Sequence, residues 1–488
     1  MKMMCRLLEF VRKRKKEILF YGCAVILFYG MFFQIDFATD SYFEFSQNPV
    51  RVFLSNGRFI GAGFFALVKE LNLSDGLIYK ISFCLAIFST VVSMIILDEM
   101  IRRRIKNKNL VRILTLLIVL NPFLIELYLF LEKGVMCLGI LCSILAVKFL
   151  VNFLENRNKK DLFKAIMVLF LAVSSYQGVI GIYLVLMVIH IISQNNDYRK
   201  KIKEIILAGV IYVSVSMINI VITKMLGFKN RAGGDIVIGE SLKKIISGTK
   251  ELIGGFNLMP ENTFFWMTIF TVGIIVALIF RAKKDKLKRL GGVFLVFISA
   301  VAAAVAPQVI LATNSIFICP RSTYAYGGII GLIMLIFYLT RREKVSFRAE
   351  KIGIIAGMIF LGLQFYGATR IITDHYETIA LDRERAKQII SMIRDYESEK
   401  KIKVEKFVVN EDSRRQKSYD GIFVSKNINN SAFWPNWSQV EIIEYYSGEK
   451  YDKAEDKDFK KFCRDRDWEY FEREQIEFQG NVVKMCLY

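Results

Sequence analysis

Histidine and proline are scarce in this sequence, which has only two histidines and six prolines among its 488 residues. With His190 and His375 alone, a histidine metal centre or a Ser-His-Asp triad has almost no material. The eight cysteines show no metal-ligand spacing, and neither a Walker loop nor a dinucleotide fingerprint occurs. We therefore expect no metal site and no bound cofactor.

Long stretches without a charged side chain are the most informative feature of the chain. They include residues 113–125, 205–222 and 264–280. Hydrophobic residues make up 54% of the sequence, and the mean hydropathy is +0.37, whereas soluble domains are roughly 45–50% apolar. Because about 20 mainly apolar residues form a helix that crosses a bilayer, the sequence predicts a polytopic α-helical membrane protein.

The net charge of +21, from 67 basic and 46 acidic side chains, would suggest nucleic-acid binding in a soluble protein. Here the positive charge lies mostly in short loops between the apolar runs, as expected for cytoplasmic loops of a membrane protein. Seven of the first sixteen residues are basic, which predicts a cytoplasmic N-terminus. We therefore expect the lipid bilayer, and not nucleic acid, as the partner.

Alternation of apolar runs and basic loops predicts about eleven transmembrane helices in residues 1–371. The stretch 162–192 has basic loops at both ends, so we interpret it as two short helices joined by a turn at 174–178. An odd number of spans places residues 372–488 outside the cytoplasm, together with the first outer loop, 36–76. The predicted spans are 18–35, 77–97, 111–130, 135–153, two within 162–192, 205–225, 264–280, 293–311, 324–339 and 352–366.

Residues 372–488 are typical of a small α+β domain. We expect a helix over 377–400, strands at 404–410 and 421–426, and a closing hairpin over 476–488 that turns at Gly480 and Asn481. Cys463 and Cys486 both lie in this segment, and the sequence allows a disulfide between them.

Acidic residues beside the first span form the clearest candidate site. Asp36 and Asp40 follow the span directly, and Arg51 and Arg58 come next. A carboxylate at the membrane surface can accept a proton from an attacking hydroxyl, and arginines can bind a phosphate through paired hydrogen bonds. Equally, these residues could be ordinary interfacial anchors.

Two glutamates near the outer end of the third predicted span are a second candidate. Charge at this depth is costly unless it faces a cavity or a partner, and this applies to Glu126 and Glu132. Glu132 could be a second carboxylate of the same cavity. The spacing favours the simpler alternative, in which it pairs with Lys133 in a short loop.

Several further residues could bind a sugar or a phosphate, although each also has a purely structural interpretation. Tyr176 and Gln177 could bind a sugar through hydrogen bonds, and Arg321 could meet a lipid phosphate. Arg231 is a positive charge on the outer side, and Lys243, Lys244 and Lys250 could belong to an amphipathic helix that contacts lipid headgroups. Trp434 and Trp437 could stack on a sugar ring or fill the core of the C-terminal domain.

The order of these features resembles the bacterial GtrII-type glucosyltransferases, GT-C-like membrane enzymes that decorate O-antigen and other surface polysaccharides. The C-terminal segment adds to the resemblance through a charged helix with Asp382 and Ala386 and through the final hairpin. The family often has a paired acidic motif where this chain has Asp40-Ser41, which leaves Asp36 as the alternative key carboxylate. The resembling motifs are Thr39-Asp40-Ser41-Tyr42, Gly57-Arg58, Asn121-Pro122-Phe123 with Glu126 and Glu132, Ser175-Tyr176-Gln177, and Pro320-Arg321.

The resemblance implies a GT-C-like fold, a multi-pass protein of the cell membrane, and transfer of a sugar at the outer face of that membrane. The donor would be glucose on a polyprenyl phosphate, usually undecaprenyl phosphate, and the acceptor a surface glycan of the cell envelope. Asp40 would be the general base, with Asp36 as the alternative. Arg58 and Arg321 would neutralise the departing phosphate, and Glu132 and Gln177 would position sugar or acceptor. Tyr176 and Arg231 complete the expected donor-binding residues.

Other functions remain as alternatives. A flippase or transporter of lipid-linked glycans would need charged residues near the membrane midplane, whereas the charges here lie outside the spans. An O-antigen polymerase would not be expected to carry a C-terminal domain of this size. A purely structural or receptor role of that domain is the third alternative.

Overall fold

The computed structural model describes residues 9, 12–194, 197–228, 238–281, 294, 296–306, 317–340, 347–411, 416–464, 466 and 468–487. The chain forms two compact units. The first unit consists of Met1–Phe33, Phe53–Tyr128 and Glu132–Thr369. The second consists of Gln34–Val52, Leu129–Leu131 and Arg370–Tyr488.

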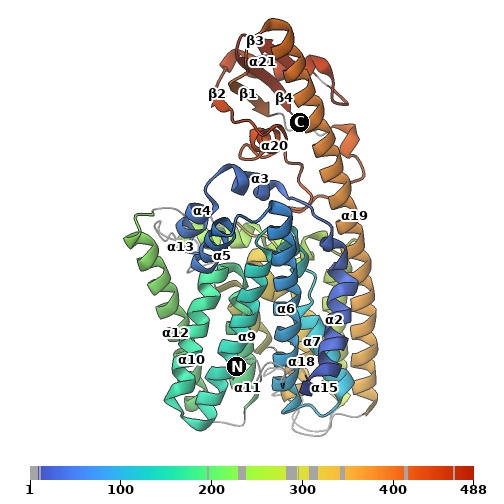
Figure 1. Ribbon diagram of the computed structural model, residues 1–488. Coiled ribbons are helices and arrows are strands. Elements are labelled where there is room, and N and C mark those ends of the chain that lie inside the picture. Colours follow the sequence, from blue (N-terminus) through green and yellow to red (C-terminus); the bar gives the residue numbers. More distant parts are fainter. Residues whose placement is uncertain are drawn as a thin grey trace. The chain divides into compact units, whose positions relative to one another are not determined.

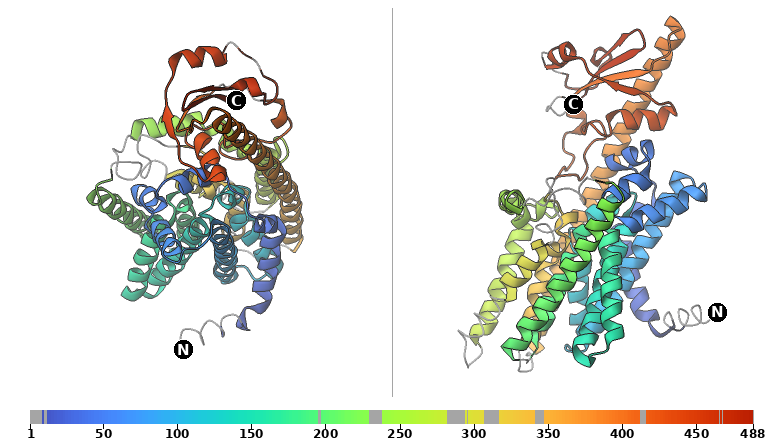
Figure 2. Two further views of the ribbon diagram at one scale, coloured as in Figure 1. Left: turned by 45° about the horizontal axis from the view of Figure 1, so that its top comes forward. Right: turned by 90° about the vertical axis from the view of Figure 1, so that its left-hand side faces the viewer.

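Helices make up the described part of the first unit (Figure 1), and α9 packs against both α6 and α10. Figure 2 shows the same helices from two further directions. In chain order, the α-helices are α2 (Lys15–Tyr29), α3 (Thr39–Ser46), α4 (Pro49–Ser55), α5 (Phe59–Glu70), α6 (Asp75–Arg102), α7 (Lys108–Val119), α8 (Leu124–Leu129), α9 (Lys133–Asn156), α10 (Lys159–Ser175), α11 (Gly181–Ser193), α12 (Tyr198–Met225), α13 (Ile238–Ser247), α14 (Thr249–Ile253), α15 (Thr263–Arg281), α17 (Tyr324–Gly327), α18 (Ile329–Thr340), α19 (Phe347–Lys400), α20 (Gln439–Ser447) and α21 (Lys457–Arg464). Short 3-10 helices are η1 (Gly30–Phe33), η2 (Gln177–Val179), η3 (Gly255–Asn257), η4 (Arg321–Thr323), η5 (Lys417–Tyr419) and η6 (Arg473–Gln475).

Six helical segments of the described residues are long and apolar enough to cross a membrane. Each coincides with a predicted span, and three shorter apolar helices coincide with others. The count of eleven spans stays a prediction. The six are Lys15–Phe33, Asp75–Arg102, Lys133–Asn156, Arg199–Met225, Arg321–Thr340 and Phe347–Lys400, and the shorter helices are Gln177–Ser193, Thr263–Ala277 and Val296–Ala306.

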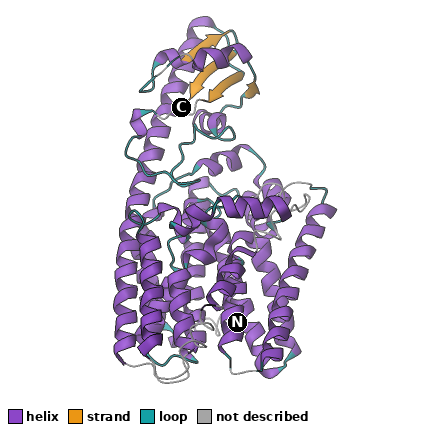
Figure 3. Cartoon of the chain, turned by 180° about the vertical axis from the view of Figure 1, so that it is seen from behind, coloured by secondary structure: helices purple, strands orange, loops and turns teal. Residues whose placement is uncertain are grey.

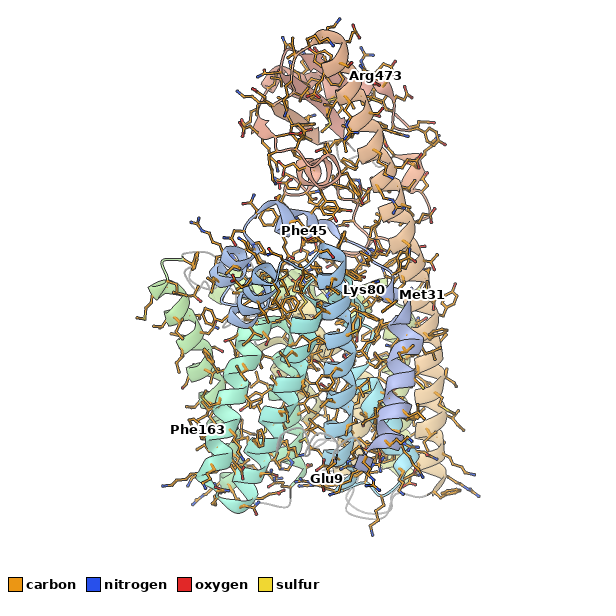
Figure 4. The ribbon with its side chains drawn as sticks, in the orientation of Figure 1. Glu9, Met31, Phe45, Lys80, Phe163 and Arg473 are labelled. Atoms are coloured by element: carbon orange, nitrogen blue, oxygen red, sulfur yellow. A yellow bond between two sulfur atoms is a disulfide. The ribbon has the colours of Figure 1, made fainter. Side chains whose placement is uncertain are left out.

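Large apolar side chains on several of these helices point away from the packed interior. Phe163 on α10 is 65% exposed and points outward in Figure 4. Trp266 and Phe270 on α15 are similarly exposed. Because water penalises such surfaces, the exposed apolar side chains and the long apolar helices indicate a protein embedded in a membrane.

The third predicted span is wrong as a single helix, because the structure divides residues 111–130 into α7 and α8. The interruption lies at Asn121 and Pro122, where proline has no N–H for a helical hydrogen bond. The Asn121 side chain replaces the missing helical bonds, since its Nδ2 donates to the Ile118 carbonyl at 2.9 Å and its Oδ1 accepts from the Phe123 N–H at 2.9 Å. The break positions Glu126 on the short helix α8.

The stretch 162–192 divides as predicted into two helices, α10 and α11. Tyr176 ends α10 in an extended conformation, with φ −160° and ψ 117°, and the short helix η2 follows it. The predicted turn therefore holds Tyr176 and Gln177 between two helices.

All strands of the described residues lie in the second unit (Figure 3). They form one mixed sheet in the order β2-β1-β4-β3. Strand β1 (Lys406–Glu411) is parallel to β2 (Asp452–Ala454) and to β4 (Val482–Leu487). Strand β3 (Ile476–Gln479) pairs with β4 in the antiparallel hairpin that the sequence predicted, and Gly480 at the turn has φ +59°.

The predicted strand at 421–426 is wrong, because this segment consists of turns and loop with one isolated bridge. Its backbone is bound to helix α19 instead of to a neighbouring strand. The Phe423 N–H donates to Asp374 Oδ2 at 2.9 Å. Nearby, buried Asp382 accepts hydrogen bonds from the Tyr419 hydroxyl at 2.7 Å and from the Ser431 hydroxyl at 2.6 Å.

Cys463 on α21 and Cys486 on β4 form a disulfide, the pairing that the sequence allowed. The bond lies in a small core with Val408, Phe459 and Trp468. It therefore ties the helix to the centre of the sheet.

Replacing both Cys463 and Cys486 with serine is expected to lower the free energy of unfolding of the second unit by about 2–4 kcal/mol, because the cross-link restricts the unfolded chain. Thermal unfolding of the purified protein in detergent measures the effect. Cys84→Ser, which changes an exposed free cysteine, is the matched control. Equal melting of the double variant and the control would show that the cross-link contributes nothing.

Candidate active site

Arg58 and Glu132 form a nearly buried ion pair in the first unit. Arg58 precedes α5 and Glu132 precedes α9, and the closest nitrogen and oxygen are 3.6 Å apart. The two side chains are only 16% and 4% exposed. Glu132 therefore faces the arginine that the sequence placed in the first outer loop, and the Lys133 ammonium lies 3.3 Å from the centre of the Tyr79 ring.

The turn that carries Arg58 is held by two side-chain amides. Gly57 has φ +68°, a conformation that favours glycine. Gln177 Nε2 donates to the Asn56 carbonyl at 2.9 Å, and Asn219 Nδ2 donates to the Gly57 carbonyl at 2.9 Å. The guanidinium of Arg58 also lies over the Tyr176 ring, 4.7 Å from its centre, which favours the charged group electrostatically.

Glu126 and Arg321 form a second buried ion pair in the same unit. Glu126 is fully buried, and its Oε1 is 3.3 Å from Arg321 Nη1. Its Oε2 accepts a hydrogen bond from the backbone N–H of Arg321 at 2.6 Å. Because burying a lone carboxylate is costly, this double contact explains how Glu126 is tolerated, and it fixes Arg321 at the start of η4.

Gly178 brings the two ion pairs close together. A Cβ atom at this position would lie 2.6 Å from the Arg321 carbonyl and 2.6 Å from the Tyr176 ring. Only a residue without a side chain lets the turn after Tyr176 approach the backbone of Arg321 so closely. The turn with Tyr176 and Gln177 therefore contacts the surroundings of both arginines.

Gly178→Ala is expected to displace Arg321 and to lower activity tenfold or more while the helices remain folded, because small displacements of charged groups weaken catalysis strongly. The rate of the proposed transfer, measured in membranes, is the readout. Gly209→Ala is the matched control, since a Cβ at Gly209 would meet nothing within 4 Å. Equal rates for both variants would contradict the role of the close approach.

The carboxylates beside the first span lie in the second unit. Asp36 is buried, and its Oδ2 is 3.5 Å from Nε2 of buried His375 on α19. Asp40, on the first turn of α3, is partly exposed, and its Oδ1 accepts a hydrogen bond from the indole N–H of Trp437 at 3.1 Å. The two aspartates therefore differ in environment, since Asp36 is enclosed and Asp40 is open to solvent.

Two tyrosines stabilise the packing of α3 against α20 in the second unit. The hydroxyls of Tyr42 and Tyr446 are 3.3 Å apart. Burial raises the pKa of both hydroxyls above the ordinary value. Both groups therefore stay neutral near pH 7 and act only as hydrogen-bonding partners.

The predicted site residues thus fall into two clusters. Arg58, Glu132, Tyr176, Gln177 and Arg321 belong to the first unit. Asp36 and Asp40 belong to the second unit, and Arg231 lies outside the described residues. Among the described residues, no group of three or more His, Cys, Asp or Glu side chains could hold a metal ion.

Sequence reasoning missed the contributions of Asn219 and His375. Asn219 lies in an apolar run of α12, where a polar amide needs a partner, so its position was a usable signal. His375 had no comparable signal, because its partner Asp36 is far away in the sequence.

Comparison with known proteins gives one match. The family model described as Glucosyl transferase GtrII matches residues 27–336, which is more than half of the 488-residue chain. No curated protein matches the chain significantly. No solved structure does so either.

Proposed function

Because the chain belongs to the GtrII glucosyl transferase family, we propose that it transfers glucose from a polyprenyl-phosphate carrier to a surface glycan. The family name supports the glucosyl transferase activity itself. The lipid-linked donor, for which undecaprenyl phosphate is the expected carrier, and the glycan acceptor, such as O-antigen, are our proposal. So is the GT-C-like arrangement of about eleven spans.

The observation that carries the donor assignment is the pair of arginines in the first unit. Arg58 and Arg321 are each held against a buried glutamate. Arg58 Nε has no hydrogen-bond partner among the described residues, so this guanidinium has a donor left for a phosphate oxygen. A guanidinium binds phosphate well because its N–H groups form a planar fork.

The transfer step follows from this assignment. The oxygen of an acceptor hydroxyl attacks the anomeric carbon of the glucose, and a new C–O bond forms there. The bond between that carbon and the phosphate oxygen breaks, and its electron pair leaves with the polyprenyl phosphate. The hydroxyl proton passes to a carboxylate. Negative charge grows on the departing phosphate, and arginine side chains stabilise that charge.

We assign the base role to Asp40, because it is the more exposed of the two aspartates in the second unit. Asp36 is the alternative. Glu132 positions Arg58, and Gln177 holds the turn that carries it. Arg231 remains a proposed donor-binding residue on the basis of its place in the outer loop alone.

The location of the second unit outside the cytoplasm is also part of the proposal. Disulfides persist in oxidising compartments and are rare in the cytosol, so the bond between Cys463 and Cys486 supports this side. The basic loops support a cytoplasmic N-terminus in the cell membrane. Polyprenyl-phosphate donors, unlike nucleotide sugars, would be available on the outer face.

The decisive experiment supplies labelled polyprenyl-phosphate-glucose to membranes that contain the protein and the host surface glycan. Label is expected to appear in the glycan, and matched membranes without the protein should show none. Labelled UDP-glucose in place of the lipid donor, in membranes washed free of cytosol, should give no transfer. Label that crosses the bilayer but stays on lipid would favour the flippase alternative. If no label moves at all, glucose on a polyprenyl carrier is not the donor.

A further inference from the structure

Trp437 stands out in the second unit because its large ring is exposed while its polar atom is bound. The side chain is 43% exposed. Its indole N–H donates to Asp40 Oδ1 at 3.1 Å, and this is its only contact with a polar side chain in the described part of the chain. One face of a large apolar ring is thus offered beside a carboxylate.

The neighbouring Trp434 shows what a packing tryptophan in this segment looks like. Its ring lies 5.8 Å from the Tyr419 ring, and its carbonyl accepts a hydrogen bond from Gln439 Nε2 at 3.2 Å. Trp434 therefore serves the interior of the unit. Trp437, two residues beyond Pro435, does not.

The segment around Trp437 is held firmly in place. The Ser438 hydroxyl donates to the Ala432 carbonyl at 2.6 Å, and Lys453 Nζ donates to the Asn436 carbonyl at 2.8 Å. Helix α3, which carries Asp40, packs along α20, where Phe45 (labelled in Figure 4) stacks on Tyr445 at 5.3 Å. An exposed ring on a rigid support loses little entropy when it binds a ligand.

We propose that Trp437 and Asp40 form a subsite for one pyranose ring of the acceptor glycan, an inference that rests on the proposed function. The C–H face of a pyranose is apolar and flat enough to stack on an indole ring, and its hydroxyls need acceptors at the edge of that ring. Asp40 supplies such an acceptor, because a carboxylate has about four lone-pair sites. The same contact brings an acceptor hydroxyl to the proposed base.

The first test measures transfer at increasing concentrations of delipidated host surface glycan. Trp437→Ala removes the ring and is expected to raise the acceptor KM about tenfold without changing the donor KM. Trp437→Phe keeps a ring and should hold the acceptor KM within about twofold, while kcat falls because Asp40 loses its N–H donor. Tyr470→Ala is the matched control, since Tyr470 is 54% exposed in the same unit. An unchanged acceptor KM in Trp437→Ala would overturn the subsite.

A second test needs no transfer and separates this inference from the proposed function. The same glycan is added without any donor, and tryptophan fluorescence is recorded for the wild type and for Trp437→Phe. We expect a change in the wild type that the variant lacks. If that change occurs but polyprenyl-phosphate-glucose gives no product, the donor assignment fails and the subsite stands. If transfer occurs without any fluorescence change from Trp437, the subsite is wrong and the function stands.

Discussion

Replacing Asp40 with asparagine is expected to lower the rate of sugar transfer about a thousandfold while the protein stays folded, because general-base catalysis contributes about 10²–10⁴-fold. Asparagine has nearly the same shape, and its amide oxygen can still accept the hydrogen bond from Trp437. It cannot take up the proton of the acceptor hydroxyl. The donor KM should therefore hardly change, and kcat should carry the loss.

Two further variants make the assignment of the base specific. Asp420→Asn changes an exposed aspartate of the same unit and should transfer sugar at the wild-type rate. Asp36→Asn tests the alternative, whose carboxylate lies beside His375. Loss of activity in Asp36→Asn with full activity in Asp40→Asn would move the base role to Asp36. Full activity in both variants would exclude both aspartates.

The second large effect is expected at Arg58. Arg58→Gln should lower transfer about 10²–10³-fold, because a group that stabilises charge in the transition state is lost. It should also lower the free energy of unfolding by about 3–5 kcal/mol, because Glu132 keeps a buried charge without this partner. Transfer assays and chemical denaturation in detergent measure the two effects separately.

The double variant Arg58→Gln/Glu132→Gln distinguishes catalysis from structure. It removes both charges, so most of the lost stability should return while transfer stays low. Lys403→Gln breaks an exposed ion pair with Glu449 and should leave both quantities unchanged. A double variant that transfers sugar at the wild-type rate would show that the ion pair only stabilises the fold.

Much of the helical framework could be predicted from the sequence, because apolar length alone decides which segments can cross a membrane. The break at Pro122 was visible as well, but a long apolar run outweighed it in the prediction. The strand at 421–426 failed for another reason. Its apolar residues fit a strand, yet Asp374, nearly fifty positions away in the sequence, binds its backbone.

The candidate site was predictable in its residue types but not in its pairs. Local spacing suggested Lys133 as the partner of Glu132, whereas folding brings Arg58 to it from a different segment. The pairs of Glu126 with Arg321 and of Asp36 with His375 likewise join distant segments. Such pairs depend on how helices pack, and a single sequence carries no direct record of that packing. The close approach at Gly178 was invisible for the same reason.

The composition of the second unit also has a consequence for biosynthesis. Its helix α3 is made early, but the partner hydroxyls of Tyr42 and Tyr446 are 404 positions apart in the chain. At a synthesis rate of about 5–20 residues per second, α3 waits roughly 20–80 s for α20 to emerge. During that time the aromatic face with Phe37, Tyr42 and Phe45 has no α20 to cover it. A growing chain with such a face should depend on chaperones or on the lipid surface, and slow translation should lower the yield of folded protein.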